Sequence, residues 1–246
     1  MSERRREMLR EMGLTPLWRA RTGATTFAPQ APAQPELVAA PATRAPLPSQ
    51  GDTRAIAILR MDWSELKASV AACTACKLHA KRTHTVFGVG DERADWLFIG
   101  EGPGQEEDAR GEPFVGQAGR LLDNMLAAID LKRGENVYIA NVVKCRPPNN
   151  RNPEPGEAAQ CEPYLTRQIA LIEPKLIVAL GRVAAQHLLA TDAAIGTLRG
   201  RLHDYRGVPL IATYHPAYLL RSPTEKAKAW ADLCFARETM RKLAAQ

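Results

Sequence analysis

Residues 95–108 read DWLFIGEGPGQEED, and this stretch indicates the fold class most clearly. The residues DWLFIG form an apolar run with the length of one buried strand, and the glycine-rich turn GEGPG begins at its last residue. Acidic side chains follow, which are typical of the first turn of a helix. A buried strand that leads through a tight turn into a helix is characteristic of a parallel sheet with helices on its faces. The stretch therefore predicts an α/β fold.

The same alternation continues on both sides of this stretch. Besides residues 95–100, apolar runs predict strands at 137–143, 175–180 and 208–213. Apolar residues at spacings of three and four predict helices at 62–72, 118–129, 158–172, 183–190 and 224–243. Asp62 is a candidate N-cap for the first of them. We expect a mainly parallel four-stranded sheet, covered on both faces, with functional groups on the loops at the carboxyl ends of its strands.

Size and charge set broad limits on the function. The chain has 246 residues, of which 45% are hydrophobic and 24% charged, and its net charge is +6. A basic excess suits a polyanionic partner such as DNA, although many proteins without such a partner are equally basic. No apolar stretch approaches the roughly 18 residues of a membrane span, and no signal-peptide core follows the arginine-rich start. We therefore expect a cytoplasmic protein.

The composition changes near residue 50. A short basic segment opens the chain, and an alanine- and proline-rich stretch at 28–49 follows it. Proline at this density favours an extended linker. We expect residues 1–50 to be a disordered tail, either a docking or DNA-touching arm or an extension without a specific function, with the second favoured. Residues 51–246 should form the folded domain.

Four of the five cysteines have the spacing of a metal site rather than of a disulfide framework. The four are Cys73, Cys76, Cys145 and Cys161. Spacing alone fits either zinc or an iron–sulfur cluster, and His79 offers zinc a further ligand. Cys234 shares the apolar face of the last helix with Trp230, so we expect it to be a buried structural residue.

The loop after the first strand does not match a nucleotide-binding motif. Gln105 stands where a GxGxxG motif needs its third glycine, and no GK[ST] follows. The acidic side chains beyond it would repel a pyrophosphate. The glycines more plausibly allow a flat ligand to approach the backbone closely. Phe114 precedes the next helix and is either a platform on which a base stacks or a residue that packs onto that helix.

Two other strand ends carry polar side chains. Asn141 offers a donor and an acceptor on one rigid amide, which suits the edge of a pyrimidine, although it could equally satisfy a turn. His215 precedes Pro216, and this restricts His215 to extended geometry at the end of a strand. The residues that follow resemble an exposed loop, in which apolar side chains enter a base stack and a cation meets phosphate. The expected DNA contacts are Leu219, Leu220 and Arg221.

The motifs GEGPGQEED, PFVG, NVVKCRPP and HPAYLLR, in this order and with the cysteine spacing, resemble the family 4 uracil-DNA glycosylases of bacteria and archaea. The resemblance covers roughly residues 73–237. It implies a three-layer α/β/α sandwich and a 4Fe-4S cluster held by the four cysteines. It also implies hydrolysis of the N-glycosidic bond of deoxyuridine in single- and double-stranded DNA, which releases uracil and leaves an abasic site.

The resemblance also implies roles for the loop residues. Phe114 would stack on the flipped uracil, Asn141 would bind its N3 and O4 edge, and His215 would donate a hydrogen bond to O2. The sugar and the attacking water would lie between Glu101, Gly102 and Pro103. Glu101 would act as general base or as electrostatic stabiliser of the cation. Glu107 would either exclude the methyl group of thymine or belong to a helical first turn.

Other functions remain open at this point. A uracil-capturing relative bonds covalently to DNA through a loop histidine, but it reads GEQPG and has an added arginine-rich loop. This chain has Gly102 and no obvious insertion in residues 77–88, which favours turnover, although His84 keeps capture possible. A module that binds uracil-DNA without turnover and a zinc-stabilised DNA-binding accessory protein are the further alternatives. A monomer is the expected oligomeric state, and the partner of the tail is unknown.

Overall fold

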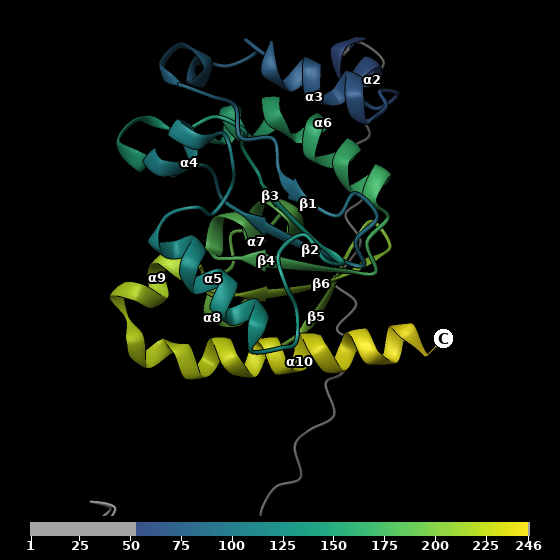
Figure 1. The fold of residues 1–246 in the computed structure, drawn as a ribbon, viewed down its shortest axis with the longest axis vertical. Coiled ribbons are helices and arrows are strands. Elements are labelled where there is room, and N and C mark those ends of the chain that lie inside the picture. The colour runs from purple at the N-terminus through teal and green to yellow at the C-terminus, as the bar shows by residue number, and fades with distance from the viewer. Residues whose placement is uncertain (1–52, 246) are drawn as a thin grey trace, which may run out of the picture. The chain divides into compact units, whose positions relative to one another are not determined.

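The computed structural model describes residues 53–245 of the chain (Figure 1). The tail expected over residues 1–50 lies outside the described residues. Nine α-helices occur in the described part: α2 (Thr53–Ile58), α3 (Trp63–Ala71), α4 (Gln105–Arg110), α5 (Gln117–Ala127), α6 (Pro155–Ile172), α7 (Arg182–Leu189), α8 (Ile195–Leu198), α9 (Pro216–Arg221) and α10 (Lys226–Ala244). Three short 3-10 turns accompany them: η1 (Lys77–Lys81), η2 (Pro148–Asn150) and η3 (Pro223–Glu225). In this part of the chain no helix is long and apolar enough to cross a membrane.

One sheet of six strands forms the middle of the fold, in the order β1-β3-β2-β4-β6-β5. The strands are β1 (Val89–Gly90), β2 (Trp96–Gly100), β3 (Val137–Asn141), β4 (Leu176–Leu180), β5 (Leu202–Tyr205) and β6 (Val208–Thr213). The four predicted strands, β2, β3, β4 and β6, are parallel to one another, as expected. The two additional strands, β1 and β5, pair antiparallel at the edges. Both are short and incompletely buried, so neither has the apolar run that marks a central strand.

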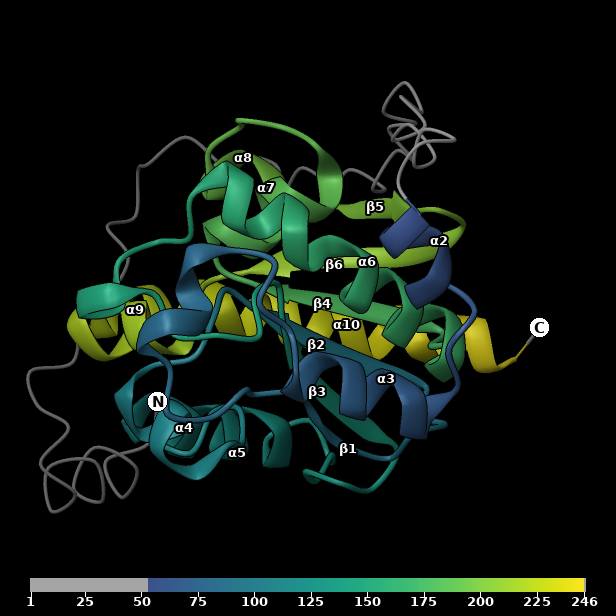
Figure 2. The same cartoon turned by 90° about the horizontal axis from the view of Figure 1, so that it is seen from above.

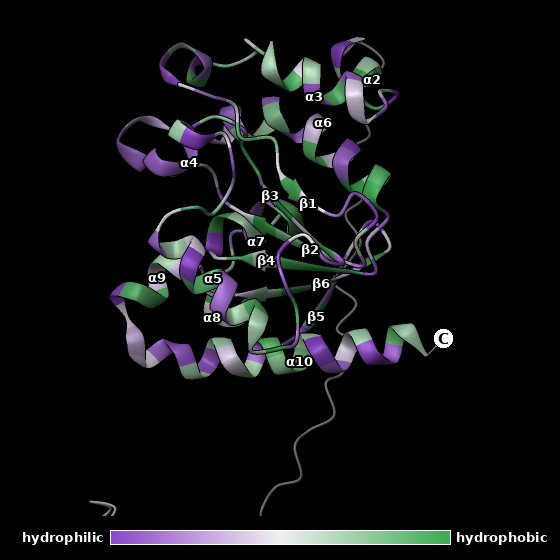
Figure 3. Cartoon of the chain, in the orientation of Figure 1, coloured by the Kyte–Doolittle hydropathy of each residue, from purple (hydrophilic) through white to green (hydrophobic). Residues whose placement is uncertain are grey.

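Alternate residues of the strands build two separate cores. Leu97 and Ile99 of β2 pack on the side of α6 and α7. Trp96 and Phe98 of the same strand pack on the side of α5 and α10. This alternation follows from the two-residue period of a strand. The central strands β2 and β4 are mostly hydrophobic, whereas α10 alternates between polar and apolar residues (Figure 3). The expected three-layer α/β/α sandwich is therefore confirmed.

A third, smaller core holds α2 and α3 against the outer face of α6 (Figure 2). Ile58, Leu66 and Val70 contribute to it together with Tyr164 of α6. The expected cap is present, because the Asp62 side chain accepts a hydrogen bond from the backbone N–H of Glu65 at 2.9 Å. This packing brings the segment after α3, with its CxxC pair, to the start of α6.

Two sequence-based expectations are wrong. The stretch expected as an exposed loop after Pro216 is the helix α9, and Leu219 is only 1% exposed within the core. A six-residue helix is too short for its periodicity to be recognised. The apolar face expected around Cys234 is also only half covered, because Trp230 is 46% exposed and Cys234 is partly buried.

Candidate active site

The carboxyl ends of the parallel strands meet at one edge of the sheet. Gly100 of β2 lies in register with Asn141 of β3, and Leu180 of β4 with Thr213 of β6. A cavity of about 750 Å³ opens at this edge. It is lined by all six residues expected to contact the substrate, which are Glu101, Gly102, Pro103, Phe114, Asn141 and His215. The fold therefore gathers residues that are more than a hundred positions apart in the sequence.

Asn141 carries a buried acceptor without a partner. The residue is 2% exposed, and its Oδ1 atom accepts no hydrogen bond. A buried polar atom of this kind is costly unless a ligand or water satisfies it. A Cβ atom at Gly100 would lie 2.5 Å from Oδ1, so the glycine leaves the room that the amide needs.

Lys144 holds the backbone of Asn141 in place through a hydrogen bond. Its Nζ donates a hydrogen bond to the Asn141 carbonyl at 2.9 Å. Although its side chain is charged, Lys144 is only 1% exposed. Burial lowers the pKa of its amine to about 8.

Phe114 lines the cavity with its ring and has an unusual backbone. Its ring centroid lies 5.5 Å from that of His215, with the planes tilted by 31°. The residue is 6% exposed, so it also packs into the core. Its φ is +55°, which is unfavourable for a side chain with a Cβ atom.

His215 has the extended backbone that the following proline requires, with φ −69° and ψ 137°. Its Nδ1 atom accepts a hydrogen bond from the backbone N–H of Ala217 at 3.2 Å. The neutral ring therefore carries its proton on Nε2. Burial lowers the pKa of the imidazole to about 4, and the charge of Arg221 acts in the same direction. A Cβ atom at Gly181 would lie 2.8 Å from that of His215, so this position also needs glycine.

Two carboxylates at the cavity have different environments. Burial raises the pKa of Glu101, and the positive charge of Arg182 partly offsets this effect. Glu107 also lines the cavity, but its oxygens accept hydrogen bonds from the backbone. One oxygen binds Gly104 N at 3.1 Å, and the other binds Val115 N at 3.0 Å and Gly116 N at 3.1 Å. Glu107 therefore links the turn before α4 to the loop before α5. It also lies in the first turn of α4, which is one of the two places expected for it.

The helix α9 forms one rim of the cavity. Leu220 is 41% exposed, and Arg221 lines the cavity, whereas the buried Leu219 is not available to DNA and packs in the core. Tyr214 and Tyr218 also line the cavity, with ring centroids 5.1 Å apart. Tyr214 and Arg182 were not among the residues predicted from the sequence. Both follow a parallel strand almost directly, which is the signal that could have identified them.

The four cysteines expected to bind metal line a second cavity together. Within residues 53–245, no three His, Cys, Asp or Glu side chains are placed to ligate one metal ion. Hydrogen-bond donors instead surround the sulfur atoms. Arg82 Nη1 lies 3.2 Å from Cys145 Sγ, and the backbone N–H of Lys144 lies 3.3 Å from Cys161 Sγ.

These donors would stabilise thiolate ligands. Without a metal, burial raises the pKa of Cys161 to about 12, so binding of a metal or cluster there would displace a proton. His79 is exposed, and its Nδ1 atom lies 2.7 Å from the carbonyl oxygen of Cys76.

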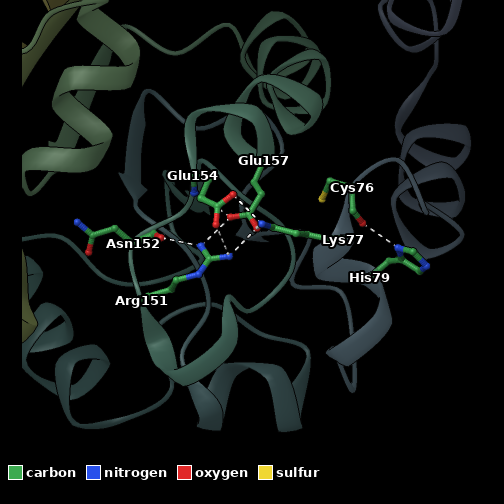
Figure 4. Close-up of polar contacts among 7 residues, drawn as sticks. All are labelled: Cys76, Lys77, His79, Arg151, Asn152, Glu154 and Glu157. Atoms are coloured by element: carbon green, nitrogen blue, oxygen red, sulfur yellow. Dashed lines mark hydrogen bonds and ion pairs between the residues drawn. The ribbon is translucent and has the colours of Figure 1, made fainter.

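An ion-pair network connects the two cavities (Figure 4). Lys77, next to Cys76, contacts Glu154 at 2.7 Å. Arg151 contacts Glu157 through two hydrogen bonds of 2.7 and 2.8 Å. Hydrogen bonding to Arg151 lowers the pKa of Glu157. Arg151 also lines the active-site cavity, so the network joins the cysteine segment to the cavity wall.

Comparisons with known proteins agree with this geometry. Residues 87–234 match the profile of the uracil DNA glycosylase superfamily. The chain is 46% identical to the type-4 uracil-DNA glycosylase of Archaeoglobus fulgidus over 176 residues, which cover 68% of this chain and 88% of that protein. It is 47% identical to the type-4 enzyme of Thermotoga maritima, over 65% of this chain and 83% of that one. A type-5 uracil-DNA glycosylase from Thermus thermophilus is 33% identical, over 53% of this chain and 68% of the relative.

Proposed function

Because the chain belongs to the type-4 uracil-DNA glycosylases, enzymes that hydrolyse N-glycosyl bonds, we propose that the cavity at the strand ends is where it acts. The substrate would be deoxyuridine in single- and double-stranded DNA, and the products free uracil and an abasic site. Inside a duplex this bond is inaccessible, so the nucleotide must rotate out of the stack at a cost of a few kcal/mol. Arg221 lines the cavity and the neighbouring Leu220 is exposed, so both would meet the DNA on either side of the flipped nucleotide.

The unpaired Oδ1 atom of Asn141 carries the proposal for base recognition. Uracil has an N–H donor at N3 and a carbonyl acceptor at O4, which complement the two ends of the amide. Cytosine has an acceptor at N3 and an amino group at C4, so it would leave Oδ1 and the amide N–H groups mismatched. Each buried group left unpaired costs about 1–3 kcal/mol. Phe114, beside the amide, offers a face on which the base would stack.

His215 would stabilise the leaving group. When the bond between C1′ and N1 breaks, both electrons remain on uracil, and negative charge develops at O2. The Nε2–H of a neutral imidazole can donate a hydrogen bond to that oxygen as the charge appears. A pKa of about 4 keeps the ring neutral at physiological pH, and the Ala217 N–H directs the proton to Nε2.

Glu101 would act on the sugar and on the attacking water. The sugar becomes an oxocarbenium-like cation, and a water molecule adds to C1′ and loses a proton. An ionised carboxylate at this place would stabilise the cation electrostatically, or accept the proton of the water as general base. Gly102 and Pro103 line the cavity next to it and would flank the sugar.

Cys73, Cys76, Cys145 and Cys161 would hold a 4Fe-4S cluster, which supplies a rigid link among three separate segments. Four thiols in one cavity, with N–H donors directed at two of the sulfur atoms, fit such a group. The free thiols also agree with a reducing compartment, the cytoplasm.

Covalent capture of DNA is the alternative that His84 raised. His84 is not among the residues that line the active-site cavity, and its Nδ1 atom lies 3.0 Å from the carbonyl oxygen of Asp108. This placement favours turnover over capture.

Product binding tests the proposed recognition. Free uracil should inhibit cleavage of uracil-containing DNA, whereas 3-methyluracil, which lacks the N3 donor, and cytosine should inhibit it far less. Asn141→Ala should weaken inhibition by uracil about 10- to 100-fold. Asn124→Ala, on the exposed side of α5, is the matched control and should behave as the wild type. Equal inhibition by uracil and 3-methyluracil would contradict the role of Asn141.

A further inference from the structure

Phe114 is held in a backbone conformation that it would not choose by itself. Its φ of +55° lies in the left-handed region, which side chains with a Cβ atom rarely adopt. Such conformations persist only where the surrounding structure enforces them, and they concentrate at functional sites. The ring of Phe114 lies in the cavity beside His215, so the conformation bears directly on where a base would stack.

The enforcing contacts come from Arg133, in the connection between α5 and β3. Its Nη1 atom donates to the carbonyl of Pro113 at 2.9 Å, and its Nη2 atom donates to the carbonyl of Phe114 at 2.8 Å. Peptide units are planar, so the relative position of these two oxygens depends on φ and ψ of Phe114. A rigid planar guanidinium that binds both oxygens therefore restricts both angles.

Neighbouring contacts hold the guanidinium and the other side of the loop. Arg133 Nε donates to Asp123 on α5 at 2.9 Å. Glu107 accepts hydrogen bonds from the N–H groups of the two residues that follow Phe114. The carbonyl of Phe114 also lies where a Cβ atom of residue 119 would come within 1.8 Å, so Gly119 is required for this close approach.

We propose that Arg133, anchored by Asp123, is a positioning residue that holds the Phe114 ring in place for the flipped base. Arg133 does not line the cavity and acts only through Phe114. The inference rests on the proposed stacking role of Phe114. The positioning role of Arg133 requires a planar group with several N–H donors, because a lysine carries its charge at a single point and cannot hold two carbonyls at once.

Equilibrium dialysis with free uracil tests the proposal without requiring turnover. Arg133→Gln and Arg133→Lys should both raise the Kd for uracil about tenfold or more, because the ring leaves its position. Lys132→Ala, a change in the same connection at an exposed ion pair, is the control and should leave the Kd unchanged. A wild-type Kd in Arg133→Lys would overturn the proposal, since charge alone would then suffice.

A double-mutant cycle separates positioning from general stabilisation. Phe114→Ala should also raise the Kd, and adding Arg133→Gln to it should have no further effect, because no ring remains to be positioned. Additive effects would overturn the proposal. If Phe114→Ala leaves the Kd unchanged, the stacking role itself fails. If Phe114→Ala weakens binding and Arg133→Gln does not, only the positioning role fails.

Discussion

At the scale of single residues, the active site depends on the protonation states that the fold imposes. His215 is kept neutral and Glu101 is made harder to ionise, in both cases chiefly because burial disfavours the charged form. A neutral donor toward the leaving group and an anion toward the sugar match the charges that develop when the bond breaks.

The pH dependence of cleavage should follow Glu101. Burial raises its pKa above the usual 4.5, so the carboxylate becomes protonated at a higher pH than an ordinary glutamate as the solution is acidified. His215, with a pKa of about 4, gains its proton only at a lower pH than Glu101. The single-turnover rate should therefore fall on the acid side with a midpoint above pH 4.5. Glu101→Gln should be slower at every pH and should lack this acid limb, and an unchanged limb in that variant would exclude Glu101 as its origin.

The sequence predicted the identity of the site residues better than their conformations. A histidine before proline at a strand end was expected to be extended, and His215 is. The left-handed backbone of Phe114 was not predictable, because the contacts that enforce it come from Arg133 and Gly119, which local sequence does not connect with it. The burial of Lys144 was not predictable for a related reason, because lysine side chains are usually exposed and only the fold shows that this one is buried against the Asn141 carbonyl.

At the scale of elements, α9 presents the surface that DNA would meet. Its six residues begin at Pro216, which supplies a favourable first helical position. The helix buries Leu219 and leaves Leu220 and Arg221 toward the rim. The difference in exposure between Leu219 and Leu220 was not predicted, because the segment was interpreted as an exposed loop. Longer elements were predicted well, because strands fully buried on both faces and helices with a clear apolar stripe leave patterns that local sequence preserves.

The salt dependence of DNA binding should report on Arg221. Arg221→Ala removes one cation from the rim, so it should weaken binding to all DNA sequences and reduce the slope of log K against log salt by about 1. Arg241→Ala is the matched control, because Arg241 is an exposed arginine near the C-terminal end of α10, far from α9 (Figures 1 and 2). A slope that changes equally in both variants would argue against a specific phosphate contact at α9.

At the scale of the whole molecule, the cysteine cavity brings together three segments that are far apart in the sequence. Cys73 and Cys76 follow α3, Cys145 follows β3, and Cys161 lies on α6. The ion pairs from Lys77 to Arg151 extend this connection to the wall of the active site. Cysteine spacing predicted the four ligands and did not distinguish zinc from an iron–sulfur cluster. The contacts of Arg82 with a sulfur atom and with the CxxC backbone were not predictable, because they depend on how the segment after α3 lies against the loop after β3.

Metal analysis should distinguish the cluster from zinc. The purified protein should be brown and contain about four iron atoms per chain, as a 4Fe-4S cluster requires. Cys145→Ser should lose most of the iron and the visible absorption, whereas Cys234→Ser should retain both, since Cys234 lies on α10 outside the cysteine cavity. One zinc atom per chain without iron would contradict the cluster assignment.

Release of free uracil under multiple-turnover conditions is the decisive test of whether the protein is a turnover glycosylase. The protein, incubated with excess uracil-containing DNA, should release many equivalents of uracil and leave abasic sites in equal number. His215→Ala should retain the fold and reduce the rate about 100- to 1000-fold, because the leaving group loses its hydrogen bond. A stable protein–DNA adduct without free uracil, or full activity in His215→Ala, would contradict the account.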